Sequence, residues 1–212
     1  MTDWTGEPGA TIWTVGHSNH PLEHFLDLLA GQEIAVLVDV RSSPYSGYAT
    51  HFNKEALQDP LQDRGVKYLF LGDLLGGRVD DEQFCDEEGR VLYGRLAESP
   101  GFRQGIERLI QGTANYRVAL MCGEEDPTHC HRRLLVGRVL RGRGVAVLHI
   151  RGDGSVRSEE QLAAEEEFQK TRGQMTLFDM EEPDEWKSTR SVLPRNPPGS
   201  SSESSAERES GG

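Results

Sequence analysis

Reactive side chains are concentrated in one stretch of the sequence, CGEEDPTHCHRR, which begins at Cys122. A thiol that lies near an arginine and a helix N-terminus ionises more easily and can attack an electrophile. Arg132 follows ten residues later and suits the binding of phosphate or carboxylate. His131 suits acid–base catalysis because the ordinary pKa of histidine lies near neutrality. This pattern indicates a nucleophilic thiol; the simpler alternative is that Cys122 is a small buried apolar side chain and His131 binds only backbone.

The same part of the chain offers ligands for a metal ion. Asp39 with Glu124 or Glu125 could hold magnesium through carboxylate oxygens and leave bound waters for hydrolysis. The spacing favours zinc less, because the sequence has no CxxC pair and no HxxxH. The sequence therefore favours magnesium over zinc as the metal. It leaves open whether any metal is bound. The soft donors available for zinc are His17, Cys122, His129, Cys130 and His131.

Polar side chains also follow the other apolar runs of the sequence. His17 and Ser18 come directly after TIWTVG, and Asp39 lies in AVLVDV, two residues before Arg41. We expect Asp39 to be partly buried and to need a partner, which Arg41 or Arg132 can supply. The side chains predicted to bind substrate are His17, Ser18, Arg41, Cys130 and Arg132. The side chains predicted to be catalytic are Asp39, Cys122, Glu124 and His131.

Strands and helices that alternate along the chain must position these residues. The strands predicted from apolar runs are Thr11–Gly16, Ala35–Val40, Tyr68–Leu71, Tyr116–Cys122 and Val145–Ile150. The predicted helices are Leu22–Leu29, Phe102–Ile110 with Ser99 as its cap, a helix that opens at Asp126 and contains Leu134–Val139, and an acidic helix after the capping box Ser158–Gln161. This alternation predicts an α/β domain of three layers, with a mostly parallel sheet flanked by helices. Such sheets bind ligands beyond the carboxyl ends of their strands, and the reactive residues lie there.

Composition excludes several classes of protein. The chain has 212 residues, enough for one domain with a substantial core. Its net charge of -12 argues against a protein that coats nucleic acid through bulk positive charge. No apolar run approaches the roughly 20 residues that span a bilayer, and the N-terminal residues do not have the pattern of a secretory signal. Three cysteines are too few for a disulfide framework, so we expect a cytoplasmic protein with no membrane partner.

The last 40 residues differ from the rest. We expect a domain over residues 10–172 and a disordered tail over residues 173–212, because the tail is polar and rich in serine and proline. Within the tail, residues 174–178 read QMTLF, which resembles the pentapeptide that binds the bacterial DNA sliding clamp. Gln174 would be the polar anchor, and Leu177 and Phe178 would enter an apolar pocket. The alternative is that Leu177 and Phe178 pack on the domain.

Several segments together resemble one protein family. They extend over about residues 11–150 and read TVGHSNHPLEHFLDLL, LVDVRSSPYS, HFNKEAL, KYLFLGDLLGGR and ALMCGEEDPTHCHRRLL. In this order they resemble the bacterial and archaeal domain of unknown function 488 family, and MCGEEDPTHCHR is the most specific part. The resemblance implies a compact α/β domain, and some members are labelled as DNA-repair proteins. It also implies that the family's motif positions are His17, Ser18, Asp39, Arg41, Cys122, Glu124, Asp126, Cys130, His131 and Arg132.

These observations lead to three hypotheses about function. The first is a prokaryotic enzyme that processes DNA or a nucleotide and is recruited to the sliding clamp by its tail. The second is a non-catalytic module that binds a nucleotide or a modified base. The third is a cysteine-dependent enzyme that transfers thiol or sulfur groups between small molecules. The sequence leaves open which bond is broken and which substrate is used.

Overall fold

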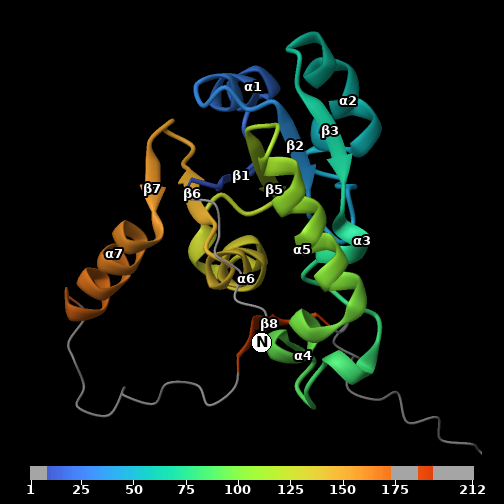
Figure 1. Cartoon of the computed structure of the whole chain (residues 1–212), viewed down its shortest axis with the longest axis vertical. Helices are drawn as coiled ribbons and strands as arrows, with labels where there is room; N and C mark the ends of the chain where they lie inside the picture. Colours follow the sequence, from blue (N-terminus) through green and yellow to red (C-terminus); the bar gives the residue numbers. More distant parts are fainter. Residues whose placement is uncertain (1–8, 173–185, 193–212) are drawn as a thin grey trace, which may run out of the picture.

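A central sheet organises the computed structural model of the chain, which describes residues 9–172 and 186–192. Its strands lie in the order β3-β2-β5-β1-β6-β7 (Figure 1). The first five of these strands pair in parallel, and β7 pairs with β6 in the antiparallel direction. The strands of this sheet are β1 Thr11–Gly16, β2 Val36–Asp39, β3 Lys67–Phe70, β5 Val118–Cys122, β6 Ala146–Ile150 and β7 Val156–Ser158. The predicted parallel sheet is confirmed, and β7 is an addition that the sequence analysis did not predict.

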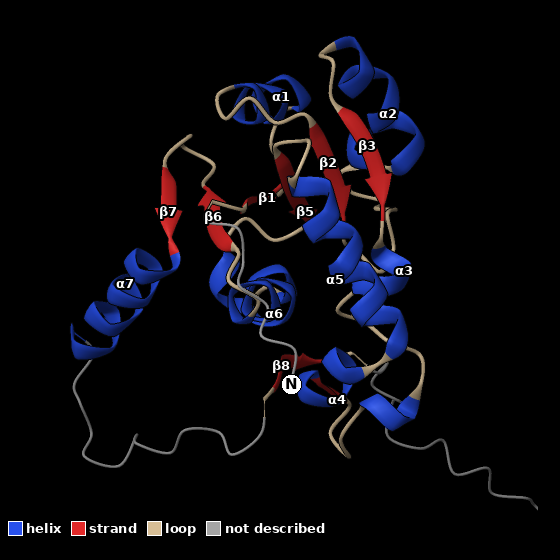
Figure 2. Cartoon of the chain, viewed as in Figure 1, coloured by secondary structure: helices blue, strands red, loops and turns tan. Residues whose placement is uncertain are grey.

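Helices connect the strands and cover the sheet. The α-helices are α1 Leu22–Ala30, α2 Lys54–Asp63, α3 Gly72–Leu75, α4 Tyr93–Glu98, α5 Pro100–Thr113, α6 Arg138–Gly142 and α7 Glu159–Arg172. Short 3-10 turns lie at Thr50–Phe52, Glu82–Phe84 and Pro127–His129, and a π-helix lies at Arg132–Gly137. The predicted caps are confirmed: Ser99 accepts a hydrogen bond from the amide of Phe102, and Ser158 and Gln161 form a reciprocal capping box. Helix α7 lies beyond β6 and β7, at the opposite edge of the sheet from α2 and β3 (Figure 2).

Two apolar clusters fill the space on the two faces of the sheet. Along β1, Ile12 belongs to the cluster that contains the buried residues of α5 and α6. Trp13 and Val15 belong to the other cluster, with the buried residues of α1 and α2. Because successive side chains of a strand point to opposite faces, one apolar strand contributes to both cores. The three-layer arrangement predicted from the sequence is therefore confirmed.

The strand register brings the candidate residues to one edge of the sheet. Gly16 at the end of β1 pairs with Cys122 at the end of β5, and Asp39 at the end of β2 pairs with Met121. Beyond the strands, the amide of His17 donates to the carbonyl oxygen of Cys122 over 2.9 Å. Residues that are far apart in the sequence therefore meet at the carboxyl end of the central strands, as parallel pairing requires.

The chain after β5 differs from the predicted continuous helix. Asp126 caps a single 3-10 turn by accepting a hydrogen bond from the amide of Thr128 over 2.9 Å. Cys130 then has an extended backbone, with φ −103° and ψ 138°, before the π-helix begins at Arg132. The prediction of one helix from Asp126 to Val139 is wrong because this extended residue interrupts the helical hydrogen bonds. The interruption changes the direction of the chain at Cys130, next to His131.

Part of the predicted disordered tail packs on the domain. Strand β8, Lys187–Ser191, pairs with β4, Arg90–Leu92, in a separate two-stranded sheet. Beside it, the indole nitrogen of Trp186 donates to the carbonyl oxygen of Leu134 over 2.9 Å, and both Trp186 and Val192 pack against the core. The prediction is therefore wrong for residues 186–192, where one indole ring and backbone pairing compensate for a polar sequence. Gln174, Leu177 and Phe178 of the clamp-like peptide lie outside the described residues.

Across residues 9–172 and 186–192, none of the helices has both the length and the apolar character needed to span a bilayer.

Candidate functional site

A pocket of about 550 Å³ opens at the carboxyl edge of β1, β2 and β5. Three strand ends supply its floor, and β8 contributes a wall from a distant part of the sequence. The residues that line it are His17, Arg41, Ser42, Ser43, Tyr45, Ser46, Gly77, Arg78, Tyr93, Cys122, Gly123, Glu124, His129, His131 and Ser188–Val192. Of the predicted site residues, His17, Arg41, Cys122, Glu124 and His131 line the pocket, whereas Ser18, Asp39, Cys130 and Arg132 do not.

Cys122 and His131 form a thiol–imidazole pair on the pocket wall. The Sγ of Cys122 lies 3.7 Å from Nδ1 of His131, and the other ring nitrogen, Nε2, lies 2.9 Å from the carbonyl oxygen of Val40. A carbonyl oxygen only accepts hydrogen bonds, so it holds the proton of the neutral ring on Nε2. The Nδ1 lone pair is then directed at the thiol and can accept its proton. This geometry is that of a nucleophile next to its general base.

Cys130 changes the ionisation of both partners. Its hydrogen bond with Cys122 lowers the pKa of the Cys122 thiol; burial opposes this shift, and the positive charge of Arg132 adds to it. Burial raises the pKa of Cys130 itself well above its ordinary value, and the contact with Cys122 raises it further. Burial alone would lower the pKa of His131, but its contacts with Cys130 raise it. Of the two thiols, Cys122 is therefore the one that ionises first.

Asp39 is bound within the protein and does not reach the pocket. Its Oδ1 accepts from the Arg41 Nε over 2.9 Å, and its Oδ2 accepts from the Arg41 Nη2 over 2.6 Å and from the Tyr68 hydroxyl over 2.7 Å. The predicted pairing of Asp39 with Arg41 is confirmed. The side chain is fully buried, so neither of its oxygens is free to bind a metal ion or substrate.

His17 holds Arg41 from the other side. Its Nδ1 donates to the carbonyl oxygen of Ser18 over 2.8 Å, which leaves the Nε2 lone pair to accept from the Arg41 Nη1 over 3.0 Å. Burial lowers the pKa of His17 to about 4, and the positive charge of Arg41 acts in the same direction. His17 is therefore a neutral residue that positions Arg41, and its pKa is too low for a proton donor at neutral pH.

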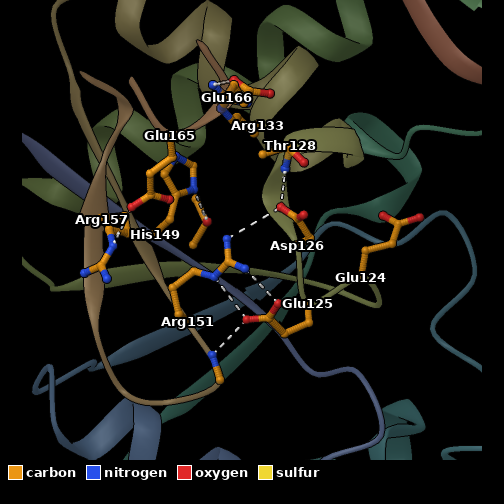
Figure 3. A network of polar contacts seen from close by, with 12 residues as sticks. Glu124, Glu125, Asp126, Thr128, Arg133, His149, Arg151, Arg157, Glu165 and Glu166 are labelled. Carbon is orange, nitrogen blue, oxygen red and sulfur yellow. Dashed lines mark hydrogen bonds and ion pairs between the residues drawn. The ribbon is translucent and has the colours of Figure 1, made fainter. Parts of the chain in front are cut away.

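The three acidic side chains after Cys122 have different surroundings: Glu125 and Asp126 pair with Arg151, whereas Glu124 lines the pocket. The carboxylate of Glu125 pairs with Arg151 over 3.1 Å and accepts from the amide of Gly152 over 2.9 Å. Figure 3 shows Arg151 between Glu125 and Asp126, whereas the carboxylate of Glu124 lies apart from it. Glu124 lines the pocket instead, with Oε2 3.9 Å from the Sγ of Cys122.

This division excludes the predicted magnesium arrangement. Asp39 and Glu125 already have protein partners, so Glu124 would have to bind the ion without them. Within the described part of the chain, the one group of three donors that lies together is Cys122, Cys130 and His131, whose ligand atoms are all within 4.8 Å of one another. The other soft donors predicted for zinc, His17 and His129, are not part of this group.

Arg132 was predicted to bind anions but supports the loop from behind. It is fully buried, and its Nη1 and Nη2 donate to the carbonyl oxygens of Glu124 and Glu125, the second over 2.6 Å. Its Nε lies 3.4 Å from the hydroxyl of Thr14. The expected role in substrate binding does not fit these contacts, because every nitrogen of the guanidinium faces protein. Arg132 instead shapes the loop that carries Glu124 beside Cys122.

Other residues of the pocket were missed by the sequence analysis. Arg78 and Arg190 are exposed at the pocket, and neither makes an ion pair with any residue in the described ranges. Arg78 is the last residue of the segment KYLFLGDLLGGR, and Arg190 lies in the segment predicted to be disordered. The phenol of Tyr93 lines the pocket, and burial raises its pKa. Nothing in the local sequence distinguishes Tyr93 from a core residue.

Comparisons with known proteins give one match. A family model described as "Domain of unknown function DUF488" matches residues 21–139, which is more than half of the chain. No curated protein and no solved structure matches the chain. The matched segment includes Asp39, Arg41, Cys122, Cys130 and His131. The family resemblance seen in the sequence is therefore confirmed.

Proposed function

The chain belongs to the DUF488 family, and we propose that it is an enzyme in which Cys122 attacks an anionic substrate as a nucleophile. The observation that carries this proposal is the position of the Cys122 Sγ, 3.7 Å from an imidazole nitrogen, at the surface of a polar pocket. A buried cysteine with only a packing role needs neither a base nor an opening.

The described residues support a simple sequence of proton and bond changes. Nδ1 of His131 takes the proton of the Cys122 thiol, and the thiolate forms a bond to an electrophilic atom of the substrate. The bond to the leaving group breaks, and the protonated His131 returns the proton to that group. The carbonyl of Val40 keeps the ring in the same orientation throughout, because it accepts from Nε2 in both protonation states.

The charges of the pocket indicate the class of substrate. Arg78 and Arg190 are free to bind phosphate or carboxylate, and Arg41, although paired with Asp39, also lines the pocket. A nucleotide or the end of a DNA strand would supply such a group, and so would a small anionic thiol compound. Of these, the nucleotide or DNA substrate is the one that a role in DNA repair requires. The non-catalytic binding module uses the same pocket but needs no reactive thiol.

The rate of alkylation of Cys122 tests the proposal. Chelator-treated protein is exposed to iodoacetamide at neutral pH, and peptide mass spectrometry follows each cysteine separately. We expect Cys122 to react faster than free cysteine and faster than Cys85, and the variant His131→Asn to lose this advantage. The matched control is Cys85→Ser, since Cys85 lies outside the pocket. A Cys122 that reacts no faster than free cysteine, or equally fast without His131, would show that the nucleophile proposal is wrong.

Recruitment to a sliding clamp is a separate part of the proposal and is carried by the sequence QMTLF at residues 174–178. A labelled peptide spanning residues 170–182 should bind purified clamp with an affinity on the order of micromolar, because the segment must become ordered on binding. Replacing Leu177 and Phe178 with alanine should remove most of this binding. If the wild-type and the double-alanine peptides bind the clamp equally weakly, the proposed recruitment to DNA loses this support.

A further inference from the structure

The donor atoms around the thiol–imidazole pair point to a metal site. We propose that Cys122, Cys130 and His131 bind one Zn²⁺ ion, and that the bound ion blocks Cys122 as a nucleophile. The binding site is independent of the proposed catalysis, whereas the blocking effect rests on it. Metal binding gives Cys130 a direct role as a ligand, besides its effect on the pKa of Cys122.

The distances fit a tetrahedral zinc site. Nδ1 of His131 lies 3.7 Å from the Sγ of Cys122 and 3.9 Å from the Sγ of Cys130. In a tetrahedral site with Zn–S bonds of about 2.3 Å and Zn–N bonds of about 2.0 Å, sulfur and nitrogen ligands are separated by roughly 3.5 Å. Both sulfur-to-nitrogen distances are therefore within a few tenths of an ångström of this value, and the three ligand atoms all lie within 4.8 Å of one another.

His131 is oriented as a metal ligand would be. Histidines that bind metals generally donate their second ring nitrogen to a carbonyl or carboxylate, which fixes the tautomer. Here Nε2 donates to the carbonyl oxygen of Val40 over 2.9 Å, so the Nδ1 lone pair faces both sulfur atoms. Gly77 packs so closely on the ring that an added Cβ would lie 2.5 Å from Cγ of His131. The ring therefore has little room to turn away from the thiols.

The backbone also holds the two cysteines in place. Cys122 is the last residue of β5, which is paired on both sides by β1 and β2. Cys130 is fully buried at the extended residue between the 3-10 turn and the π-helix. Donor side chains on such rigid supports have lost most of their conformational freedom before the ion arrives. Binding therefore costs little further conformational entropy.

The chemistry of the donors selects the metal. Two thiolates and one imidazole suit Zn²⁺ or another soft ion, whereas Mg²⁺ prefers oxygen ligands. Zinc binding releases the protons of the two thiols to solvent and needs no proton from His131, because Nδ1 already carries a lone pair. The fourth ligand would be a water molecule, or Glu124 after its side chain moves, since its Oε2 lies 3.9 Å from the Sγ of Cys122. A sulfur lone pair used for zinc is no longer free to attack a substrate.

Binding is tested on the full-length protein after chelation, with cobalt and zinc as probes. Titration with Co²⁺ should produce thiolate-to-cobalt charge-transfer absorption and the visible bands of a tetrahedral ion, and one equivalent of Zn²⁺ should remove both. The variant Cys130→Ser should weaken binding at least about 100-fold, since it loses a direct ligand. His131→Asn should also weaken binding, and Cys85→Ser should bind as the wild type does. Circular dichroism shows whether each variant is folded.

The outcome separates the two proposals. Absence of the cobalt spectrum in wild-type protein, or binding that is unchanged in folded Cys130→Ser and His131→Asn, would overturn the metal site. One equivalent of Zn²⁺ should also slow the alkylation of Cys122 at least about tenfold in wild-type protein but not in Cys130→Ser. Zinc that binds without slowing alkylation would overturn the blocking effect. If metal binds but metal-free Cys122 reacts no faster than free cysteine, the nucleophile proposal fails and the metal site stands.

Discussion

Two histidines, His149 in β6 and His131 just before the π-helix, are used in opposite ways. His149 on β6 is completely buried, and both of its ring nitrogens have polar partners: Nδ1 lies 2.8 Å from the hydroxyl of Thr14, and Nε2 lies 2.9 Å from Oε1 of Glu159. His131 has one such partner, the carbonyl of Val40, and turns its other nitrogen to the thiols and the pocket. A buried polar group with all its partners stabilises a fold, whereas one with an unused lone pair is available for chemistry.

The network around His149 continues in both directions. Glu159 binds Arg133 over 3.1 Å, and Arg133 also binds Glu166 over 2.9 Å, as part of the set of polar contacts in Figure 3. At the other end, the hydroxyl of Thr14 is within 3.4 Å of Arg132. Arg132 therefore connects this polar network, made of Thr14, His149, Glu159, Arg133 and Glu166, to the loop beside Cys122. The charged groups behind the pocket hold the loop in shape, whereas the few groups without such partners line the pocket.

The largest expected effect on stability comes from breaking the polar network around His149. Glu159→Ala leaves the buried His149 without the carboxylate at its Nε2 and leaves Arg133 with Glu166 alone, so the free energy of unfolding should fall by about 3–5 kcal/mol. Urea denaturation measures the change. Glu165→Ala is the control, because the ion pair of Glu165 with Arg157 lies at the surface and should contribute less than about 1 kcal/mol. A small effect of Glu159→Ala would mean that the polar partners of His149 do not stabilise the fold, and the contrast with His131 would then fail.

The close contact between Gly77 and the ring of His131 allows a test of whether the position of His131 governs the reactivity of Cys122. An added Cβ at Gly77 would lie 2.5 Å from the ring, so Gly77→Ala should cost about 1–3 kcal/mol of unfolding free energy and displace His131. The alkylation rate of Cys122 should then fall toward that of a free thiol. Gly142→Ala is the matched control, because nothing lies within 4 Å of an added Cβ there. Unchanged thiol reactivity in Gly77→Ala would show that the position of His131 does not govern Cys122.

The pH dependence of stability reports on another histidine, the buried His17. Its folded pKa of about 4 lies below the ordinary value of 6.5, so the unfolded chain binds more protons between these values. The contribution is fully present above pH 6.5 and is lost as the pH falls. Between pH 7.5 and pH 5.5 we expect His17 to account for a decrease of about 1 kcal/mol in the free energy of unfolding.

Variants at this position show whether His17 causes the decrease. The charged and titratable groups that face it are Arg41, Asp39 and His51, and they remain in His17→Gln. That variant should have a correspondingly flatter pH profile in urea denaturation experiments. A profile as steep as that of the wild type would assign the pH dependence to other groups, of which His149 is the first candidate because burial also lowers its pKa.

A stability effect well below that of Glu159→Ala is expected where the chemistry is proposed. Cys122→Ala removes a nearly buried sulfur that has contacts but no strong hydrogen bond, so the free energy of unfolding should change by less than about 1.5 kcal/mol. The same variant should lose cobalt binding and the reactive thiol together. A loss of stability as large as that of Glu159→Ala would indicate that Cys122 is a structural residue and not a functional one.

Much of the framework could be predicted from local patterns. The parallel strands, the helix caps at Ser99 and Ser158, and the location of the site at the carboxyl edge all follow from residues within a few positions of one another. The Asp39–Arg41 pair was predictable for the same reason, since its members are two residues apart. The roles of Glu125 and Arg132 were not, because their partners are Arg151, just after β6, and backbone carbonyls that the sequence does not place.

The sequence by itself determined which side chains would gather at the end of the sheet, because the period of apolar residues defines strands and parallel strands align their carboxyl ends. Tertiary structure alone decided how these side chains are used. It placed Asp39 and Arg132 behind the pocket, brought Cys130 next to Cys122, and closed one wall with β8. The physical reason is that burial and hydrogen bonding depend on three-dimensional neighbours, and a charged or reactive group is free for chemistry only where packing leaves it without a partner.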